Sequence, residues 1–424
     1  MNVYFSGIGG VGIGPLAEIA RDAGHIIMGS DLAESMVTNE LREQGVEVNI
    51  GQDGAFLKES HEKQPLDWFV YTAALPKDHP ELMVAKELGI RTGKRDEFLA
   101  DFLEQHKLKL IAVAGTHGKT TTTGMLVWAF KQRGIPVSYS VGTTISFGPS
   151  GKYDPKSEYF IYECDEYDRN FLNFKPAISL ITSVDYDHPD SYPTEKEYFD
   201  SFNQFFSQSN MVIGWNTDIN ADNLESHGIL HIADKQTRDV SFINLAGLHN
   251  RQNAYLVFTL LVNYLGATNE EAEIVRILNS FPGTDRRFEK LEDNIYSDYG
   301  HHPEEIAATL QLASELSDNV VLVYQPHQNW RQHSIRDQYT DQFKTARKIY
   351  WTSTYLTREN ADFEILVAEQ LTANITNREN IVYAELDDDL WNVIVQERND
   401  GALVLLMGAG PIDDWARGKI SLGA

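Results

Sequence analysis

The 424-residue sequence is longer than one hydrophobic core usually organises, so we expect two or three domains. Its hydrophobic fraction of 42% and charged fraction of 23% are those of an ordinary globular protein, and no apolar run is long enough to span a membrane. The net charge of −26 would repel nucleic acid phosphates and anionic lipids, so we expect neither nucleic acid nor a membrane as a partner. The single cysteine, Cys164, excludes a disulfide framework, and no basic leader precedes the first predicted strand, so we expect a cytoplasmic protein.

The first 31 residues predict a strand, a glycine turn, a helix and a second strand. Gly7, Gly9 and Gly12 have the spacing GxGxxG, and Asp31 ends the second strand about where a ribose hydroxyl would need an acceptor. This pattern is typical of dinucleotide binding, although by itself it is weak evidence for any particular nucleotide. An NAD-dependent oxidoreductase therefore stays open at this point. Alternating strands and helices continue to a polar connection at 101–107.

A second glycine-rich turn follows the buried strand predicted at 108–114 and leads into a helix predicted at 120–131. Backbone N–H groups of such a loop bind anionic oxygens, Lys119 adds a positive charge, and the Thr120 hydroxyl can ligate Mg²⁺. A complete Walker A motif would have glycine in place of Val113, so the match is partial. The alternative is a threonine-rich helix start with a chance Gly-Lys pair.

Acidic residues and a histidine follow the next two predicted strands, which end at residues 164 and 183. Ligands of open α/β sheets lie beyond the carboxyl ends of the strands, so Glu163, Asp165, Glu166 and His188 are expected to face the phosphate loop. Carboxylates are the usual ligands of Mg²⁺, and a histidine is less usual. The acidic run at 165–168 can also be a solvated surface loop.

Further along, GLHNRQN at 247–253 precedes a helix predicted at 254–265. His249, Asn250 and Asn253 fall near that helix start, where they can cap the helix or offer amide groups to a base. The segment PGTDRRF at 282–288 has turn residues and two adjacent arginines, and we place a domain boundary there.

The last third of the chain again alternates strands and helices. Polar clusters follow its predicted strands at 295–298 and 320–324, where histidines can cap helices or form a site. Strands are predicted at 295–298, 320–324, 348–351, 381–383 and 402–407, and helices at 304–316, 336–346, 364–371 and 388–395. We expect an α/β protein of three domains, 1–106, 107–282 and 283–424, with a Rossmann-like first domain, a P-loop ATPase-type α/β second domain and a Rossmann-like third domain.

Six motifs occur together in a fixed order, and with them the chain resembles the Mur ligases. They are GIGGVGIGPLAEIA at 7–20, GSD at 29–31, AGTHGKTTTT at 114–123, HNRQNA at 249–254, GTDRRF at 283–288 and DYGHHPEE at 298–305. The resemblance implies that the first domain binds the UDP part of a nucleotide sugar, the second ATP with Mg²⁺, and the third an amino acid. The implied reaction joins L-alanine to the carboxylate of UDP-N-acetylmuramate through an acyl phosphate, in peptidoglycan precursor synthesis.

The resemblance also implies roles for individual residues. Those implied to bind ATP are Gly115, Thr116, Gly118, Lys119, Thr120, Thr121, Asn250, Asn253, Arg286, Arg287, Asp298 and Tyr299. Those implied to bind the nucleotide sugar or the amino acid are Gly9, Gly10, Val11, Gly12, Asp31, His302, His327 and Arg331. The implied metal residues are Thr120, Glu163 and His188, and the implied catalytic residues are Lys119, Glu163, His188, His327 and Arg331.

Two departures from the family pattern concern the third domain. Gln328 stands where the family commonly has arginine after the histidine of its QPH motif, and GAGPI at 408–412, with Pro411, replaces GAGDI. The identity of the amino acid is therefore the least secure part of the prediction, and a relative that adds a preformed peptide stays open. The proton acceptor is His327 or His302, and we expect a monomer or a homodimer.

Overall fold

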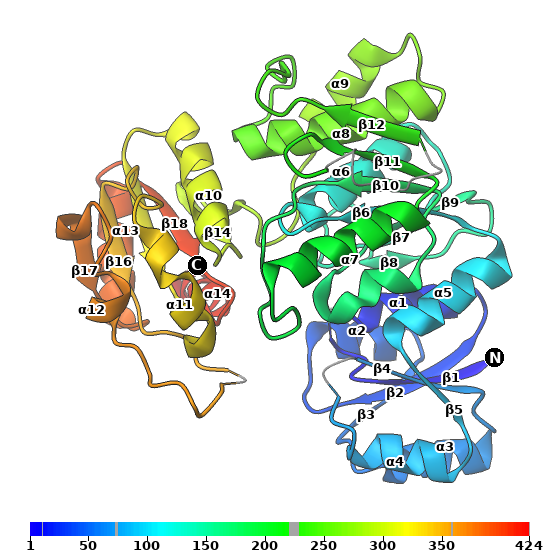
Figure 1. The fold of residues 1–424 in the computed structure, drawn as a ribbon. Helices are drawn as coiled ribbons and strands as arrows, with labels where there is room; N and C mark the ends of the chain where they lie inside the picture. The colour runs from blue at the N-terminus through cyan, green and yellow to red at the C-terminus, as the bar shows by residue number, and fades with distance from the viewer. Residues whose placement is uncertain (11, 73–74, 220–228, 358, 424) are drawn as a thin grey trace. The chain divides into compact units, whose positions relative to one another are not determined.

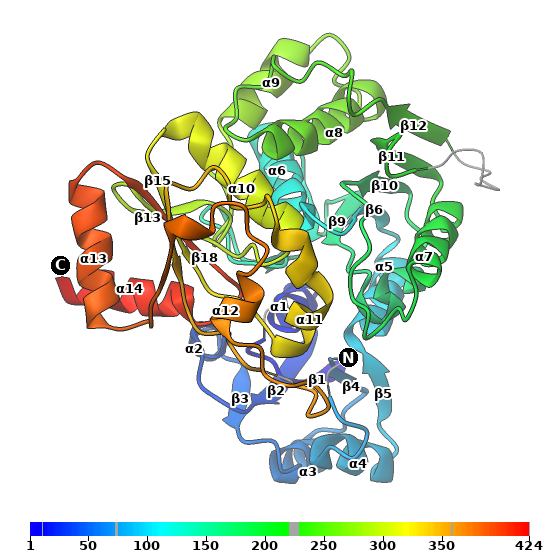
Figure 2. The ribbon, with the colours of Figure 1, turned by 60° about the vertical axis from the view of Figure 1, so that its left-hand side comes forward.

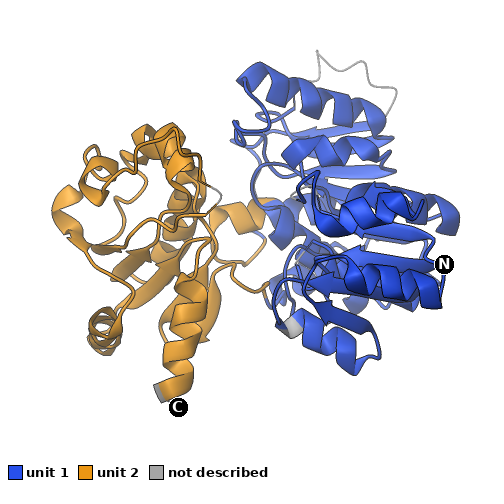
Figure 3. Ribbon diagram, turned by 90° about the horizontal axis from the view of Figure 1, so that it is seen from below, with its two compact units in different colours: residues 1–242, 253–282 blue, residues 243–252, 283–424 orange. Residues whose placement is uncertain are grey.

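The computed structural model describes residues 1–10, 12–72, 75–219, 229–357 and 359–423. The chain forms two compact units, which Figure 3 colours separately. Unit 1 comprises residues 1–242 and 253–282, and unit 2 comprises residues 243–252 and 283–424. Unit 1 contains two sheets and unit 2 contains one, and every sheet is flanked by helices (Figures 1 and 2). The α/β class with three sheets is confirmed.

The first sheet is parallel throughout, with the strand order β3-β2-β1-β4-β5. Its strands are β1 (Asn2–Ser6), β2 (Ile26–Asp31), β3 (Glu47–Ile50), β4 (Trp68–Tyr71) and β5 (Arg91–Lys94). The central strand β1 is buried on both faces, as parallel sheets covered by helices require. The helices are α1 (Gly14–Asp22), α2 (Met36–Glu43), α3 (Ala55–Lys63), α4 (Pro80–Glu87) and α5 (Arg95–His106). Helices α3 and α4 cover one face, and α1 and α5 the other (Figure 1).

The second sheet has seven strands in the order β12-β11-β10-β6-β9-β7-β8, and only the β7–β8 pair is antiparallel. The strands are β6 (Lys109–Ala114), β7 (Ser138–Ser140), β8 (Gly151–Lys152), β9 (Tyr159–Glu163), β10 (Ile178–Ile181), β11 (Met211–Trp215) and β12 (Ile229–Ala233). The helices are α6 (Lys119–Gln132), α7 (Glu195–Gln208), α8 (Leu248–Tyr264) and α9 (Glu271–Asn279), with a 3₁₀ helix at Tyr167–Asn173. The strand that precedes the glycine-rich loop, β6, lies between β9 and β10, so its carboxyl end opens where both acidic segments begin.

The two sheets of unit 1 share one hydrophobic core, which contains side chains from α1, α5 and both sheets. Helix α1 packs against β8 so closely that a Cβ on Gly151 would lie 2.1 Å from the Pro15 carbonyl oxygen. At the same contact the buried Glu18 carboxylate accepts a hydrogen bond from the Gly151 N–H, at 2.8 Å. Tyr162 of β9 donates to Asp96 of α5, at 2.7 Å. These contacts hold the two glycine-rich loops in one body.

Unit 2 contains a six-stranded sheet in the order β13-β14-β18-β15-β16-β17, in which only β13 is antiparallel to its neighbour. The strands are β13 (Glu289–Glu292), β14 (Ile295–Asp298), β15 (Val320–Tyr324), β16 (Lys348–Trp351), β17 (Ile381–Tyr383) and β18 (Leu403–Met407). The helices are α10 (Pro303–Leu316), α11 (Asn329–Ile335), α12 (Ala368–Leu371), α13 (Asp388–Asn399) and α14 (Ile412–Gly423). Helices α10 and α11 pack on one face of the sheet, and α13 and α14 on the other (Figure 2).

Three helix predictions were wrong in extent. The helix predicted at 336–346 is instead α11 at Asn329–Ile335 followed by a 3₁₀ helix at Arg336–Tyr339. The start of α11 is held by the loop at 359–366: the Glu359 carboxylate accepts the Asn329 N–H, and backbone groups of Glu364 and Leu366 bind the Asn329 side chain. The helix predicted at 364–371 shrinks to α12. Helix α8 begins at Leu248, six residues before its predicted start, directly after Gly247 at φ +85°. Among the described helices, none is long and apolar enough to cross a membrane.

Glu18 makes stability depend on pH. Burial raises the pKa of this carboxyl group to about 7, although the Gly151 N–H opposes the shift. The folded protein therefore binds a proton that the unfolded chain releases near pH 4.5, so the stability contributed at Glu18 is full at low pH and is lost as the pH rises through 7. Each unit of pKa shift corresponds to about 1.4 kcal/mol. Glu18→Gln should unfold at a higher temperature than the wild type at pH 8 and at the same temperature at pH 4, below the pKa of the unfolded chain. The exposed Glu43→Gln is the matched control, and an identical pH profile for wild type and Glu18→Gln would contradict the prediction.

Candidate phosphate and substrate sites

The glycine-rich loop between β6 and α6 depends on two glycines with positive φ. Gly115 has φ +133°, and a Cβ there would lie 2.4 Å from the Thr182 hydroxyl. Gly118, at φ +82°, caps α6, and its Cβ would lie 2.8 Å from the Asn253 amide nitrogen. The loop is therefore pressed against the end of β10 and against α8. The first N–H groups of α6 have no partner within the helix, so they form an anion site at its N-terminus.

Side chains behind the loop hold its conformation. The Thr116 hydroxyl donates to the Asp185 carbonyl at 2.8 Å and lies 2.7 Å from the Tyr198 hydroxyl. The His117 N–H donates to the Ser183 hydroxyl at 3.0 Å. These bonds tie the loop to the segment after β10, which was expected to carry metal ligands. Thr121, half-buried, lies in the first turn of α6.

Lys119 lies inside the loop and forms a buried ion pair. Its Nζ donates to Gly115 O at 2.6 Å, to Thr116 O at 3.1 Å and to Glu166 Oε2 at 2.8 Å. Burial by itself would lower the pKa of Lys119, but the carboxylates of Glu166 and Asp165 outweigh it and raise that pKa. The ammonium group therefore stays charged. Glu166 follows β9 and was expected to face the phosphate loop. It was not among the residues to which the family resemblance gave a role.

Glu166 is fully buried and has an oxygen available for a further partner. Within the described part of the chain its Oε1 accepts no hydrogen bond, and His188 Nε2 lies 3.5 Å away. The Tyr192 hydroxyl holds the Glu166 carbonyl at 2.5 Å, so the segment cannot easily turn outward. His188 itself has φ +58° and lies 3.7 Å from Asp187. The structure thus brings His188 to the loop through Glu166.

A second pair of oxygens lies at the loop, between Thr120 and Glu163. The Thr120 hydroxyl donates to Glu163 Oε1 at 2.9 Å, and the Gly142 N–H donates to Glu163 Oε2 at 3.0 Å. No group of three or more His, Cys, Asp or Glu side chains that could hold a metal is found among the described residues. Magnesium does not need one, because it usually keeps several waters and binds one or two carboxylates together with substrate phosphates. The donor set of Thr120 and Glu163 fits this ion.

In the first glycine turn the acidic residue binds the turn itself, whereas in the dinucleotide pattern it binds a ribose hydroxyl. Asp31 Oδ2 accepts the Gly9 N–H at 2.8 Å, and Asp31 Oδ1 accepts the Leu32 N–H at 2.7 Å, so this carboxylate stabilises the turn itself. The Gly10 N–H donates to the Gly7 carbonyl at 3.0 Å. Val11, also expected to bind substrate, lies outside the described residues.

Arg95, which the sequence analysis missed, lies over this first turn. A Cβ on Gly12 would be 2.4 Å from its Nη1. The guanidinium group also contacts Asp96 at 3.2 Å and Asp165 at 3.3 Å. A positive charge beside a glycine turn suits a diphosphate. In the sequence, the only indication of this role was the position of Arg95 directly after β5.

The two asparagines expected at the base lie on α8. Asn253 is buried beside Gly118. Asn250 belongs to the part of α8 that is in unit 2, and its Nδ2 donates to Ala246 O at 3.0 Å.

In unit 2, Asp298 and the arginine pair gather at the carboxyl ends of β14 and β18. Asp298 accepts the N–H groups of Phe288 at 2.8 Å and Gly300 at 2.7 Å. Burial raises its pKa to about 6, although Arg287 opposes the shift. The guanidinium groups of Arg286 and Arg287 lie 4.7 and 5.3 Å from the centre of the Tyr299 ring. Arg286 also donates to Gly408 O at 3.0 Å.

A histidine and arginine cluster follows at the end of β15. Arg331 Nη1 lies 2.6 Å from His301 Nε2, and because arginine can only donate, this nitrogen of His301 must be the acceptor. His301 Nδ1, 3.2 Å from the Tyr299 carbonyl, then carries the proton. The His327 ring lies 5.6 Å from the His301 ring and stacks on Tyr355 at 5.8 Å. His301 belongs to the DYGHHPEE motif at 298–305, and the sequence analysis assigned it no role.

The remaining candidate residues of unit 2 lie at positions held by backbone hydrogen bonds. His302 is buried at the start of α10, and its N–H donates to Glu305 at 3.2 Å. Gln328 is also buried, has φ +60°, and donates its N–H to the Tyr355 carbonyl at 2.9 Å. Pro411 precedes α14, and its carbonyl accepts the Trp415 N–H at 2.9 Å.

A lysine and carboxylates gathered around one phosphate loop, in an α/β protein of three sheets, are typical of an enzyme that uses a nucleoside triphosphate. Sequence profiles of known families agree with this class. Residues 2–107 match the Mur ligase family, catalytic domain, residues 113–243 the Mur ligase middle domain, and residues 286–410 the Mur ligase, glutamate ligase domain.

Individual relatives match over nearly the whole chain. UDP-N-acetylmuramate–L-alanine ligases of Caldicellulosiruptor saccharolyticus and Clostridium tetani are 32% and 31% identical to it, over 97% of this chain and 97% and 96% of theirs. A crystal structure of UDP-N-acetylmuramate–alanine ligase from Thermotoga maritima has the same fold, with a TM-score of 0.75, 23% identity and coverage of 100% of this chain and 99% of that one. The chain belongs to the Mur ligase family. Mur ligases are ATP-dependent ligases that form amide bonds, so the oxidoreductase alternative is wrong.

The Lys119–Glu166 pair allows a test that separates catalysis from folding. Lys119→Ala should lower ATP-dependent phosphate release at least about a hundredfold, because a positive charge at the phosphates is lost. It should also destabilise the protein by about 3 to 5 kcal/mol, because Glu166 is left charged and buried. Adding Glu166→Gln should restore the unfolding temperature but not the activity. Activity recovered together with stability would show that Lys119 acts only in folding.

Glu163→Gln tests the metal assignment. Glutamine keeps the size of the side chain, and its one oxygen can still accept from either Thr120 or Gly142, but this neutral oxygen is a weaker ligand for a hard cation. The Mg²⁺ concentration for half-maximal activity should rise about tenfold, the order expected for losing one charged ligand contact. Glu158→Gln, an exposed carboxylate directly before β9, is the control. A metal titration unchanged from wild type would remove Glu163 from the site.

Proposed function

We propose that this enzyme joins L-alanine to the carboxylate of UDP-N-acetylmuramate and converts ATP to ADP and phosphate, in peptidoglycan precursor synthesis. The observation that supports it most strongly is the match to alanine ligases at about 30% identity over 97% of the chain. In this proposal residues 1–106 bind the nucleotide sugar, residues 107–282 bind ATP, and residues 283–424 admit the amino acid. Both nucleotides are cytoplasmic metabolites, so we place the enzyme in the cytoplasm. A monomer or a homodimer stays a prediction.

The reaction would run in two steps. The substrate carboxylate attacks the γ-phosphorus of ATP, which forms an acyl phosphate and releases ADP. The amine of alanine then attacks the acyl carbon, the amide bond forms, and phosphate leaves with the electrons of the carbon–oxygen bond. Both substrates of the first step are anionic, so Lys119 and Arg286 or Arg287 would offset their repulsion, while Gly115, Gly118 and the start of α6 orient the phosphates. Bound Mg²⁺, held by Thr120, Glu163 and His188, would neutralise further phosphate charge.

The nucleotide sugar would bind at the first glycine turn. Gly9, Gly10 and Gly12, which lack side chains, would let its diphosphate approach the backbone closely, and Arg95 lies close enough to Gly12 to add a positive charge. The N–H groups of Gly9 and Gly10 are donated within the turn, to Asp31 and to the Gly7 carbonyl. Asp31 would act through the turn, since its carboxylate already accepts the Gly9 N–H. The base of ATP would bind at Asn250 and Asn253, and its ribose at Asp298 and Tyr299.

The amino acid would bind at the histidine and arginine cluster of unit 2. Arg331 would pair with the substrate carboxylate, and its bond to His301 would fix the direction of the guanidinium group. Of the two candidates for the proton acceptor we propose His327, because it stands beside His301, whereas His302 is buried at the start of α10.

The choice of amino acid is tested with purified enzyme, UDP-N-acetylmuramate, ATP and a panel of acceptors. Phosphate release should be fastest with L-alanine and slower with glycine, L-serine and an L-alanyl peptide. Gln328→Arg should lower the KM for alanine without much change in kcat, because an arginine adds charge-assisted binding of the carboxylate. Faster release with the peptide would favour the peptide-adding alternative, and an unchanged KM would mean that position 328 does not contact the amino acid.

A further inference from the structure

A carboxylate on α10 organises the turn that precedes α8, and neither the motifs nor the family resemblance points to it. The turn and the first residues of α8 together comprise residues 243–252, which belong to unit 2 and carry Asn250 (Figure 3). Glu315, near the end of α10, accepts four hydrogen bonds. Its Oε2 accepts the Gly247 N–H at 3.0 Å and Arg251 Nη1 at 2.8 Å, and its Oε1 accepts Arg251 Nη2 at 2.9 Å and Gln311 Nε2 at 2.6 Å.

These contacts make Glu315 a charged anchor at all physiological pH values. The bond from Arg251 is the main reason that the pKa of Glu315 falls to about 2, and Gln311 and the Gly247 N–H add to it while burial opposes it. An arginine paired through two parallel N–H···O bonds is among the stronger side-chain interactions and fixes geometry as well. Gln311, one turn earlier on α10, accepts the Leu248 N–H at 3.0 Å. Two side chains of α10 thus bind the N–H groups with which α8 begins.

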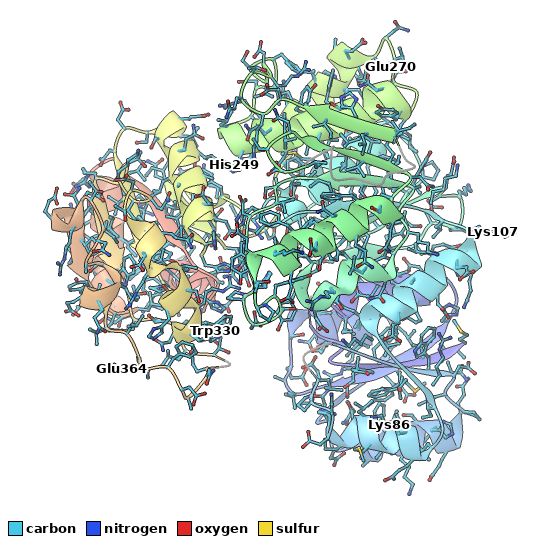
Figure 4. All side chains as sticks on the ribbon, viewed as in Figure 1. Lys86, Lys107, His249, Glu270, Trp330 and Glu364 are labelled. Atoms are coloured by element: carbon cyan, nitrogen blue, oxygen red, sulfur yellow. The ribbon has the colours of Figure 1, made fainter. Side chains whose placement is uncertain are left out.

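Close packing around Gly247 restrains the backbone of the turn in addition to these bonds. Gly247 has φ +85°, and a Cβ there would lie 2.9 Å from the His249 ring and 3.0 Å from Leu312. Burial lowers the pKa of His249 to about 4, so this ring, labelled in Figure 4, is neutral inside the turn. The Asn250 amide is held by its own bond to the Ala246 carbonyl. Glu315 therefore binds a residue on each side of Asn250, the backbone N–H of Gly247 and the guanidinium group of Arg251.

We propose that Glu315 is a positioning residue for recognition of the nucleotide base: by clamping residues 247–251 onto α10 it fixes the direction of the Asn250 amide. The proposal rests on the proposed function, in which Asn250 faces adenine. An amide that is fixed before binding loses less conformational freedom when the base arrives. Without the clamp the base should bind more weakly, whereas the phosphates, which bind at the loop before α6, should not be affected.

The test compares ligands that share phosphates and differ in the base. Binding of ADP, GDP and inorganic tripolyphosphate, each with Mg²⁺, is measured by calorimetry on the full-length protein and its variants. Glu315→Ala should weaken ADP about tenfold, the order of a lost hydrogen bond to a charged group. Its preference for ADP over GDP should fall, and its affinity for tripolyphosphate should stay within about twofold of wild type. Asp318→Asn, an exposed carboxylate just after α10, is the charge-matched control and should leave all three affinities unchanged.

A double-variant cycle asks whether Glu315 acts through Asn250. Asn250→Ala should reproduce the loss of ADP binding, and the double variant should bind ADP no more weakly than Asn250→Ala alone, since residues that act as one unit are not additive. Glu315→Gln, which keeps an acceptor for the Gly247 N–H, replaces the alanine variant if that one does not fold.

Three results would overturn the proposal. They are an ADP affinity unchanged in Glu315→Ala, an equal loss for ADP and tripolyphosphate, and fully additive effects in the double variant. If Asn250→Ala weakens ADP and Glu315→Ala does not, the proposal fails and the proposed function stands. If the wild-type protein itself binds neither ADP nor tripolyphosphate, the proposed function fails.

Discussion

The ion pair between Lys119 and Glu166 is the interaction on which the phosphate loop depends. In a chain with a net charge of −26, an anionic nucleotide can bind only where positive groups are concentrated. Lys119 is such a group, yet it is buried, and burial alone would favour its neutral form. Glu166 keeps it charged and holds it across the loop carbonyls. Burying the Glu166 carboxylate costs free energy, and its attraction to the Lys119 ammonium group offsets that cost.

The neighbouring residue, Asp165, contacts the other glycine turn through Arg95. Burial would raise the pKa of Asp165, but Lys119 and Arg95 lower it, so this carboxylate stays ionised between two cations. Two adjacent residues after β9 therefore organise the positive charge at both glycine turns of unit 1. The shared core and the tight contact of α1 with β8 keep these charges in a fixed arrangement. A mutation in the acidic run is expected to affect both turns.

In unit 2, two of the candidate site residues are held by neutral partners or by the backbone. Arg331 is directed by an unprotonated nitrogen of His301, and Asp298 is satisfied by backbone N–H groups rather than by a close cation. The arginine pair lies against the Tyr299 ring, and its carboxylate contacts are long, 3.7 Å from Arg286 to Asp413 and 3.8 Å from Arg287 to Glu305. Such groups keep much of their charge for an anionic ligand. The turn clamped by Glu315 shows the opposite case, a cation fully paired in order to fix a backbone.

The sequence by itself determined the α/β class, most strand positions, the phosphate loop and the family, because hydrophobic runs, glycine spacing and short motifs are local signals. Tertiary structure decided which charges meet. Glu166 rather than another acidic residue pairs with Lys119, Arg95 reaches Gly12, and residues 243–252 join unit 2, and each of these depends on contacts between segments distant in the chain. The start of α11 was likewise set by the distant residues Glu359 and Glu364, which bind Asn329. Local propensity carries no information about such partners, so only the folded chain could select them.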